Sequence, residues 1–280
     1  LDAFTTGDRN VAVGPNALTN VTTGYRNVGI GDRAGNSITT GLGGVYIGYL
    51  AGYGGNQSGN VAIGHEALYT ANSNSNVAIG YETAKSTTSN DGVWIGVGAG
   101  RDGAGAGQSV LVGHYAGQYM VGSEVTLIGK SAGQYASGSR NTFVGGNAGK
   151  GGTTSAPYSS GQYNVAMGYA ALQAFTTGYN NTILGYRAGY STTTGFTNVY
   201  LGYQAGFRNT TGRANIAIGS NSQQGVSGQT TGQYNVSIGE QSLLGLTTGN
   251  HNFVVGSNAG LSLTTGEHNV IIGASAGDAL

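Results

Sequence analysis

Cysteine is absent from the 280-residue chain, proline occurs twice, and charged residues make up 8% of the sequence. Without cysteine there is neither a disulfide framework nor a thiolate metal site. Lys and Arg together number 11, as do Asp and Glu, so no excess positive charge is present to neutralise phosphates. No apolar run approaches the roughly 20 residues that span a bilayer. We therefore expect no nucleic-acid partner, no membrane insertion of this segment, and no cofactor.

Glycine is abundant, at 55 residues, but it follows no three-residue period, which excludes collagen. Instead the glycines mark an internal repeat whose unit reads Asn-Val-Ala-Ile-Gly at residues 60–64. We call the last Gly of each unit the anchor, and residues at one offset from the anchors a column. Sixteen copies occur, and thirteen of the fifteen anchor spacings are 16 or 17 residues. The anchors are Gly14, Gly31, Gly48, Gly64, Gly80, Gly96, Gly113, Gly129, Gly145, Gly168, Gly185, Gly202, Gly219, Gly239, Gly256 and Gly273.

The columns before the anchor are typical of short β-strands. The residue directly before the anchor is Val, Ile, Leu or Met in all sixteen copies, and the residue three before the anchor is Val, Thr, Ile or Phe. Side chains alternate along a strand, so these two columns share one face. Thr-Thr-Gly occurs nine times, with its Gly seven residues before the anchor. Such β-branched runs punctuated by Gly and Asn indicate strands and tight turns, about two strands per unit.

A unit of this size cannot bury its own apolar face, whereas stacked copies can. The sequence therefore predicts an all-β fold, a parallel β-solenoid of about sixteen coils of 16–17 residues, with residues 1–280 forming a single repeat array. The two Val-x-Ile columns are expected to point into the dry interior of the coils. The two long spacings, 23 and 20 residues, predict solvent-facing loop insertions near 150–161 and 222–230.

An Asn stands four residues before the anchor in twelve copies. Two interpretations stay open for it. Stacked at one coil height, these side chains would form an amide ladder in which each satisfies the next. Alternatively, Asn is chosen because it tolerates the left-handed backbone of a turn. Neither interpretation is catalytic.

The column two before the anchor lies between the Val-x-Ile columns and should point away from the coil interior. It nevertheless holds nine large apolar side chains, a strip larger than soluble monomers expose. We therefore predict that this column is the interface of a parallel homo-oligomer. The alternative is that the strip forms the interior and its flanking columns face out. The predicted interface residues are Tyr46, Trp94, Leu111, Leu127, Phe143, Ile183, Tyr200, Val254 and Ile271.

The pattern Asn-Val-Ala-Ile-Gly-x-x-Ala, at 60–67, 76–84 and 215–219, resembles the head repeats of trimeric autotransporter adhesins. The array Thr-Thr-Gly-x-x-Asn-Val-x-Ile-Gly-Tyr-x-Ala-Gly, as at 193–206, is similar to repeats in phage tail fibres. The resemblance covers essentially the whole chain. It implies a left-handed parallel β-roll that forms a tight homotrimer on a cell surface or a virion tail, and so an extracellular structural or attachment role. Because both ends of the chain fall inside a repeat, we expect it to be part of a longer fibre.

Tyrosine is the aromatic residue of this chain, with 18 copies against 6 Phe and 1 Trp. In one column, directly after the anchor, it occurs as Tyr49, Tyr81, Tyr169, Tyr186 and Tyr203. Such a ladder is a candidate platform for a surface glycan or a protein receptor. The alternative is a ladder that only stabilises the stack. Tyr158 and Tyr163, in and beside the first insertion, are a second candidate contact site.

Catalytic and metal-binding patterns are sparse. Glu66 and Glu82 share a column, and stacked like charges would raise one pKa, as a glycan-cleaving solenoid requires. His251 and His268 should stack in adjacent coils, and we expect a solvated corner rather than a metal site. Thr-Thr pairs in consecutive coils suggest ice binding as an alternative function, although adjacent Thr side chains would point opposite ways. Structural attachment remains the preferred interpretation, and the protein is not expected to be an enzyme.

Overall fold

A computed structural model describes residues 6–70, 72–103, 105–225 and 230–278. This described part contains sixteen β-strands and no helix. The chain divides into two compact units, Leu1–Gln134 and Tyr135–Leu280, each a parallel β-solenoid. The prediction of an all-β parallel solenoid is confirmed.

Each strand has three residues and ends immediately before an anchor Gly. The first unit holds β1 (Val11–Val13), β2 (Val28–Ile30), β3 (Val45–Ile47), β4 (Val61–Ile63), β5 (Val77–Ile79), β6 (Val93–Ile95), β7 (Val110–Val112) and β8 (Thr126–Ile128). The second unit holds β9 (Thr142–Val144), β10 (Val165–Met167), β11 (Thr182–Leu184), β12 (Val199–Leu201), β13 (Ile216–Ile218), β14 (Val236–Ile238), β15 (Phe253–Val255) and β16 (Val270–Ile272).

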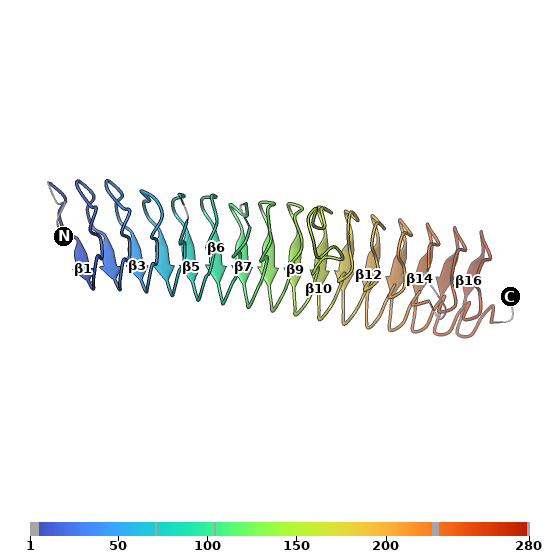
Figure 1. The fold of residues 1–280 in the computed structure, drawn as a ribbon. Coiled ribbons are helices and arrows are strands. Elements are labelled where there is room, and N and C mark those ends of the chain that lie inside the picture. The colour runs from blue at the N-terminus through green and yellow to red at the C-terminus, as the bar shows by residue number, and fades with distance from the viewer. Residues whose placement is uncertain (1–5, 71, 104, 226–229, 279–280) are drawn as a thin grey trace. The chain divides into compact units, whose positions relative to one another are not determined.

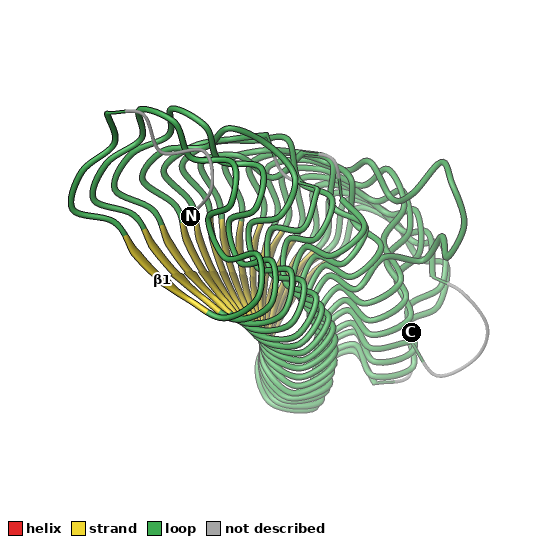
Figure 2. Ribbon diagram, turned by 60° about the vertical axis from the view of Figure 1, so that its left-hand side comes forward, coloured by secondary structure: helices red, strands yellow, loops and turns green. Residues whose placement is uncertain are grey.

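Within each unit every strand pairs in parallel with the next one in the chain (Figure 1). The register is the same throughout, so equivalent residues face each other, for example Val61 with Val77 and Ile63 with Ile79. Each coil therefore contributes one strand, not the two that the sequence suggested. The remainder of the coil consists of turns and loops (Figure 2). These turns still stack through backbone hydrogen bonds, such as Leu18 N–H to the Ala34 carbonyl at 3.0 Å.

The anchor column requires glycine. Gly64 has a φ of 131°, and a Cβ at this position would lie 2.3 Å from the carbonyl oxygen of Gly80 in the next coil. Any side chain would therefore collide with the backbone of the stacked coil. The anchor ends the strand and turns the chain while successive coils stay close enough for hydrogen bonding.

The interior of each coil is lined by the middle residue of the strand, which corrects the sequence prediction. All nine predicted interface side chains are buried within the single chain, eight of them with 0% exposure. They therefore form the core and are not available as an oligomer interface. The Val-x-Ile columns expected inside flank them and point out, as the exposed Ile30, Ile95 and Ile128 show. The corrected residues are Tyr46, Trp94, Leu111, Leu127, Phe143, Ile183, Tyr200, Val254 and Ile271.

The reason is that the arc after the anchor folds back over the middle residue. The residue four positions after the anchor meets it, and the two columns compensate in volume. Where the middle residue is large, the fourth is Gly: a Cβ at Gly52 would lie 2.1 Å from the ring of Tyr46. Where the middle residue is small, as at Ala62, the fourth is a buried Leu68. Because interiors are close-packed, such complementary pairs fill most coils. Where both residues are small, as at Gly29 and Gly35, the neighbouring coil supplies the volume, and Leu18 lies against both.

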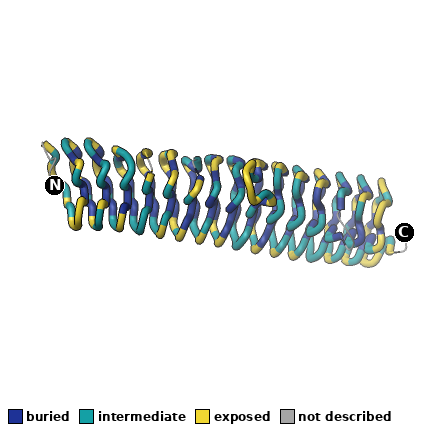
Figure 3. The backbone as a smooth tube through the Cα atoms, viewed as in Figure 1, coloured by how far each residue is buried: buried dark blue, intermediate teal, exposed yellow. Residues whose placement is uncertain are grey.

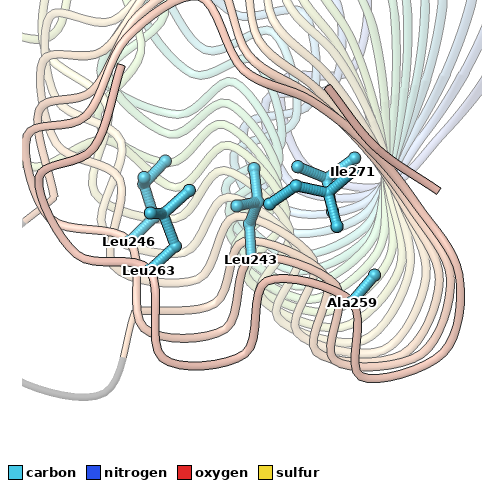
Figure 4. Close-up of a cluster of buried hydrophobic side chains, with 6 residues drawn as sticks. Leu243, Leu246, Ala259, Leu263 and Ile271 are labelled. Carbon is cyan, nitrogen blue, oxygen red and sulfur yellow. The ribbon is translucent and has the colours of Figure 1, made fainter. Parts of the chain in front are cut away.

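The buried column is continuous within each unit (Figure 3). Near the end of the second unit, Leu243, Leu246, Leu263 and Ile271 form one buried cluster (Figure 4). Leu243 follows its anchor by four positions and pairs with the small Ser237 in the middle of β14. In this cluster, too, a large residue in one of the two columns accompanies a small residue in the other.

The Asn column forms the amide ladder, one of the two interpretations left open by the sequence. The Asn198 side-chain amide donates to Oδ1 of Asn181 at 3.0 Å and to the carbonyl of Gly212 at 2.9 Å. Its own Oδ1 accepts the backbone N–H of Asn215 at 3.0 Å. Each Asn thus satisfies backbone groups in a buried turn, where an unpaired group costs about 1–3 kcal/mol.

Most of the first insertion lies at the surface, since residues 152–157 are exposed or half-buried. The second insertion, near 222–230, falls partly outside the described residues at 226–229.

Candidate functional site

Side chains directly after the anchors form a ladder on the surface. Tyr169, Tyr186 and Tyr203 stack in successive coils, with ring centroids 5.7 and 5.3 Å apart and planes inclined by 16° and 6°. The rings are 41–50% exposed. The in-register pairing of β10, β11 and β12 places them one above the other.

Tyr49 and Tyr81 belong to an equivalent ladder in the first unit. They do not touch, because His65 lies between them at 5.1 Å from Tyr49 and 4.8 Å from Tyr81. The sequence reasoning missed His65. It occupies the same column, directly after Gly64, so the repeat alignment contained the signal.

The geometry determines what these ladders can present to a ligand. Near-parallel rings cover one another's faces inside each ladder, so a saccharide, which stacks on a free aromatic face, has no access to these inner faces. At the end of the ladder, Gly146 on the coil before Tyr169 carries no side chain that would cover the outer face of the Tyr169 ring. Apart from such end faces, the ladders present ring edges and hydroxyl groups to solvent, which favours a stabilising role for the stack over a stacking platform.

Tyr158 and Tyr163 lie in different surroundings, although the sequence grouped them. Tyr158 stacks on Tyr135 with centroids 6.2 Å apart. Tyr163 instead receives a hydrogen bond on its hydroxyl oxygen from Arg140 Nη1 at 2.7 Å, and the same guanidinium lies 5.5 Å from its ring centroid. Tyr163 also lines a pocket of about 260 Å³, together with Tyr179 from the next coil.

A longer stack begins at Tyr179. Phe196 lies 4.8 Å from Tyr179 with planes 5° apart, and Arg213 lies between Phe196 and Tyr234 at 5.6 and 5.5 Å from their centroids. His251 and His268 continue the stack. The ring centroids of Tyr234 and His251 are 4.9 Å apart, and those of His251 and His268 are 5.0 Å apart. The sequence reasoning found only the two histidines. It missed Tyr234, which shares their column, as well as Tyr179, Phe196 and Arg213, which lie in the adjacent column.

The predicted stacking of His251 and His268 is thus confirmed, and both residues are exposed. Within the described ranges no group of three or more His, Cys, Asp or Glu side chains gathers as a potential metal site.

A wider groove of about 500 Å³ lies on another side of the second unit. Its walls include the stacked pair Tyr190 and Phe207, 5.2 Å apart, and the hydroxyl groups of Ser191, Thr193 and Thr210. The hydroxyl of Thr193 is already donated to the carbonyl of Thr210 at 3.1 Å. This groove is therefore an open surface lined by groups that stabilise the stack.

The two stacked acids are both paired with cations. Lys85 lies 2.5 Å from a Glu66 oxygen and 3.0 Å from a Glu82 oxygen, and Arg101 lies 3.1 Å from Glu82. The hydrogen bond from Lys85, helped by the charge of Arg101, lowers the pKa of Glu82. The hydrogen bond to Glu66, followed by that to Glu82, raises the pKa of Lys85. A general acid needs the opposite shift, so the expectation of a raised pKa is wrong for Glu82.

The chain matches no protein-family model, no curated protein and no solved structure. In the part of the chain that the structure describes, no helix is long and apolar enough to cross a membrane.

Proposed function

We propose that this chain is a non-enzymatic segment of an extracellular attachment fibre, part of a cell-surface adhesin or a virion tail, and that it assembles as a homotrimer. A β-solenoid is consistent with a fibrous structural protein. Within each unit, in-register backbone hydrogen bonds connect each coil to the next, and in the second unit a buried amide ladder adds to them. Such cross-links along the stacking direction suit a segment that holds binding surfaces at a distance from their support.

The observation that carries the assembly proposal is the outward Val-x-Ile face. In each unit the first and third residues of eight strands form two parallel columns, most of them Val, Ile or Leu and none of them charged. Ile30, Ile95, Val110, Met167 and Ile238 are among its exposed members. A continuous apolar sheet face of this kind is typical of an interaction surface.

A second copy of the chain is the occupant that suits this face best. Sixteen such side chains per unit expose on the order of 1,000 Å², compared with about 800 Å² per partner in a standard interface. Identical faces with the same coil spacing match each other in length and pitch, as a symmetric homo-oligomer requires. The interface thus moves from the middle column, which is internal, to its two flanking columns.

Measuring the mass of the full chain in solution tests this proposal. We expect light scattering coupled to size-exclusion chromatography to give three chains per particle. Substituting Ile95→Lys together with Ile128→Lys, on the outward face of β6 and β8, should dissociate the particle. Val121→Lys is the matched control, because Val121 is an exposed aliphatic side chain outside any strand. A monomeric wild-type chain at micromolar concentration would refute the assembly.

Ice binding is the second candidate function, and one observation supports it. The second Thr of each Thr-Thr-Gly in the second unit lies at the surface in consecutive coils: Thr177, Thr194, Thr211, Thr231, Thr248 and Thr265. The first Thr donates its hydroxyl to the next coil, as Thr176 does to the Thr193 carbonyl at 3.2 Å. The solenoid therefore presents one row of Thr hydroxyl groups to solvent, whereas two parallel rows would be needed to form a flat ice-binding surface. Thermal hysteresis in a freezing assay would favour this function over attachment.

A further inference from the structure

The ring stack of the second unit contains a gap at one position. From Tyr179 to His268 each ring or guanidinium contacts the next one at 4.8–5.6 Å. Tyr163 and Tyr179 stand in neighbouring coils and in the same pair of adjacent columns. A pocket of about 260 Å³ lies where the contact would be, and both rings line it. This position directly follows the insertion at 150–161.

Each of the two rings is supported on one side. Arg140 lies over Tyr163, 5.5 Å from its centroid, and Phe196 lies against Tyr179 at 4.8 Å. The two tyrosines remain 49% and 42% exposed. Because their supports hold them in place, little side-chain entropy is lost when a ligand enters the pocket that they line.

The other lining groups are polar and uncharged. Ser160, Gln162 and Thr177 are exposed and supply two hydroxyls and one amide, and Gly161 completes the lining. The Tyr163 hydroxyl oxygen already accepts a hydrogen bond from Arg140, so its proton is directed to another acceptor. None of the described residues that line the pocket carries a carboxylate or an ammonium group.

We propose that this pocket, which we call the Tyr163–Tyr179 slot, binds one neutral saccharide ring. A pyranose has C–H faces that pack on aromatic rings and hydroxyl groups that exchange hydrogen bonds with Ser, Thr, Gln and Tyr side chains. The volume lies just below the range for drug-sized ligands, which leaves room for a single ring. A charged sugar lacks a counter-charge in the lining, and a purely aromatic ligand leaves the polar groups without partners.

The slot deepens the attachment role, and it rests on that proposed function only for its biological setting. A single ring of about a dozen heavy atoms binds at about millimolar affinity. Repetition of the slot in a trimer would then convert weak contacts into avidity.

The test uses saturation-transfer NMR on the full chain with a panel of methyl pyranosides: glucoside, galactoside, mannoside and N-acetylglucosaminide. We expect at least one to bind with a dissociation constant of about 1 mM. Tyr163→Ala and Tyr179→Ala should each weaken binding tenfold or more. Tyr203→Ala is the matched control, since it removes an exposed stacked Tyr of the same unit without touching the slot.

Two results would overturn the proposal: no pyranoside binds, whether or not p-cresol, a mimic of a Tyr side chain, binds instead, or pyranoside binding survives both slot substitutions. Circular dichroism of each variant shows whether the solenoid is folded, and Tyr163→Phe, which keeps the ring, reports on the hydroxyl alone if an Ala variant unfolds. The oligomeric state is measured separately, so failure of the slot and failure of the trimer are distinguishable.

Discussion

The two units use the same strand but connect their coils differently. In the second unit the Asn ladder is unbroken through eight residues: Asn141, Asn164, Asn181, Asn198, Asn215, Asn235, Asn252 and Asn269. In the first unit this column is interrupted by Gly44, Gly92, Ser109 and Val125. There a chain of ion pairs and amides runs across the coils from Glu66 through Lys85, Glu82, Arg101 and Asp102 to the buried Gln118 and Gln134.

The interruptions at Gly44 and Gly92 have a steric cause. A Cβ on Gly92 would lie 2.0 Å from the indole of Trp94, and a Cβ on Gly44 would lie 2.4 Å from the Tyr46 ring. Trp94 and Tyr46 therefore leave no room for an Asn in their own coils, whereas the coil of the equally buried Tyr200 accommodates Asn198. The comparison teaches that the interior and the amide ladder compete for the same space in the coils of Trp94 and Tyr46.

The largest effect is expected from converting a coil with a large interior residue and no ladder Asn into a coil with a small interior residue and a ladder Asn. Trp94→Ala alone should cost about 3–5 kcal/mol of stability, because it empties a buried site. Gly92→Asn alone should also destabilise by several kcal/mol through its clash with the indole. The triple variant Gly92→Asn, Trp94→Ala, Gly100→Leu reproduces the coil of Asn60, Ala62 and Leu68 and should recover at least half of the loss.

Thermal and urea unfolding of the single and triple variants measure this recovery. Additive losses in the triple variant would show that the columns do not compensate. Retention of the parallel β signal in circular dichroism is the control for folding.

The next largest effect distinguishes the continuous Asn ladder of the second unit from the interrupted Asn column of the first unit. Asn198→Ala removes two donated bonds and leaves the Gly212 carbonyl and the Asn215 N–H without partners, which should cost about 3 kcal/mol. Asn76→Ala, beside the interruption at Gly92, leaves the Gly92 N–H unpaired and should cost about 1–2 kcal/mol. Urea midpoints of the two variants provide the comparison, and equal losses would show that ladder continuity adds nothing.

A smaller effect is expected from acid, and it concerns the first unit. The pKa of Glu82 is lower in the folded chain than in the unfolded one, so its ion pairs stabilise the fold above the ordinary Glu pKa of about 4.3. This contribution is lost as the pH falls through the lowered pKa. Wild type should exceed Glu82→Gln by about 1 kcal/mol at neutral pH and by nothing near pH 2. A stability difference that is constant with pH would contradict this ion-pair account.

The smallest effect belongs to the surface ladder. Tyr186→Ala removes two ring contacts, to Tyr169 and Tyr203, and should lower stability by about 1 kcal/mol. A melting temperature lowered by a few degrees is the expected readout. Tyr186→Phe, which keeps the ring, should be close to neutral, and a large loss in that variant would give the hydroxyl an unexpected role.

Much of the candidate site could be predicted from the columns of the repeat alignment. The repeat alignment placed Tyr169, Tyr186 and Tyr203 together and paired His251 with His268. It did not find the slot, because Tyr163 and Tyr179 occupy different columns and the insertion between 150 and 161 shifts what lies beside them. Nor did it pair Glu66 with Lys85, since that contact joins two different columns, two and five positions after the anchor.

The sequence by itself determined the repeat, the strand direction and register, and the in-register stacking of equivalent residues, because a fixed period allows one pairing that keeps every anchor glycine in contact with the next. It also determined that Val28 and Ile30, or Val61 and Ile63, share a face, since side chains alternate along a strand. Only the tertiary structure decided which face is inside. Alternation is symmetric between the two faces, and the choice was made by the arc after the anchor, which folds over the middle residue and fills the coil with Tyr46 against Gly52 or Ala62 against Leu68.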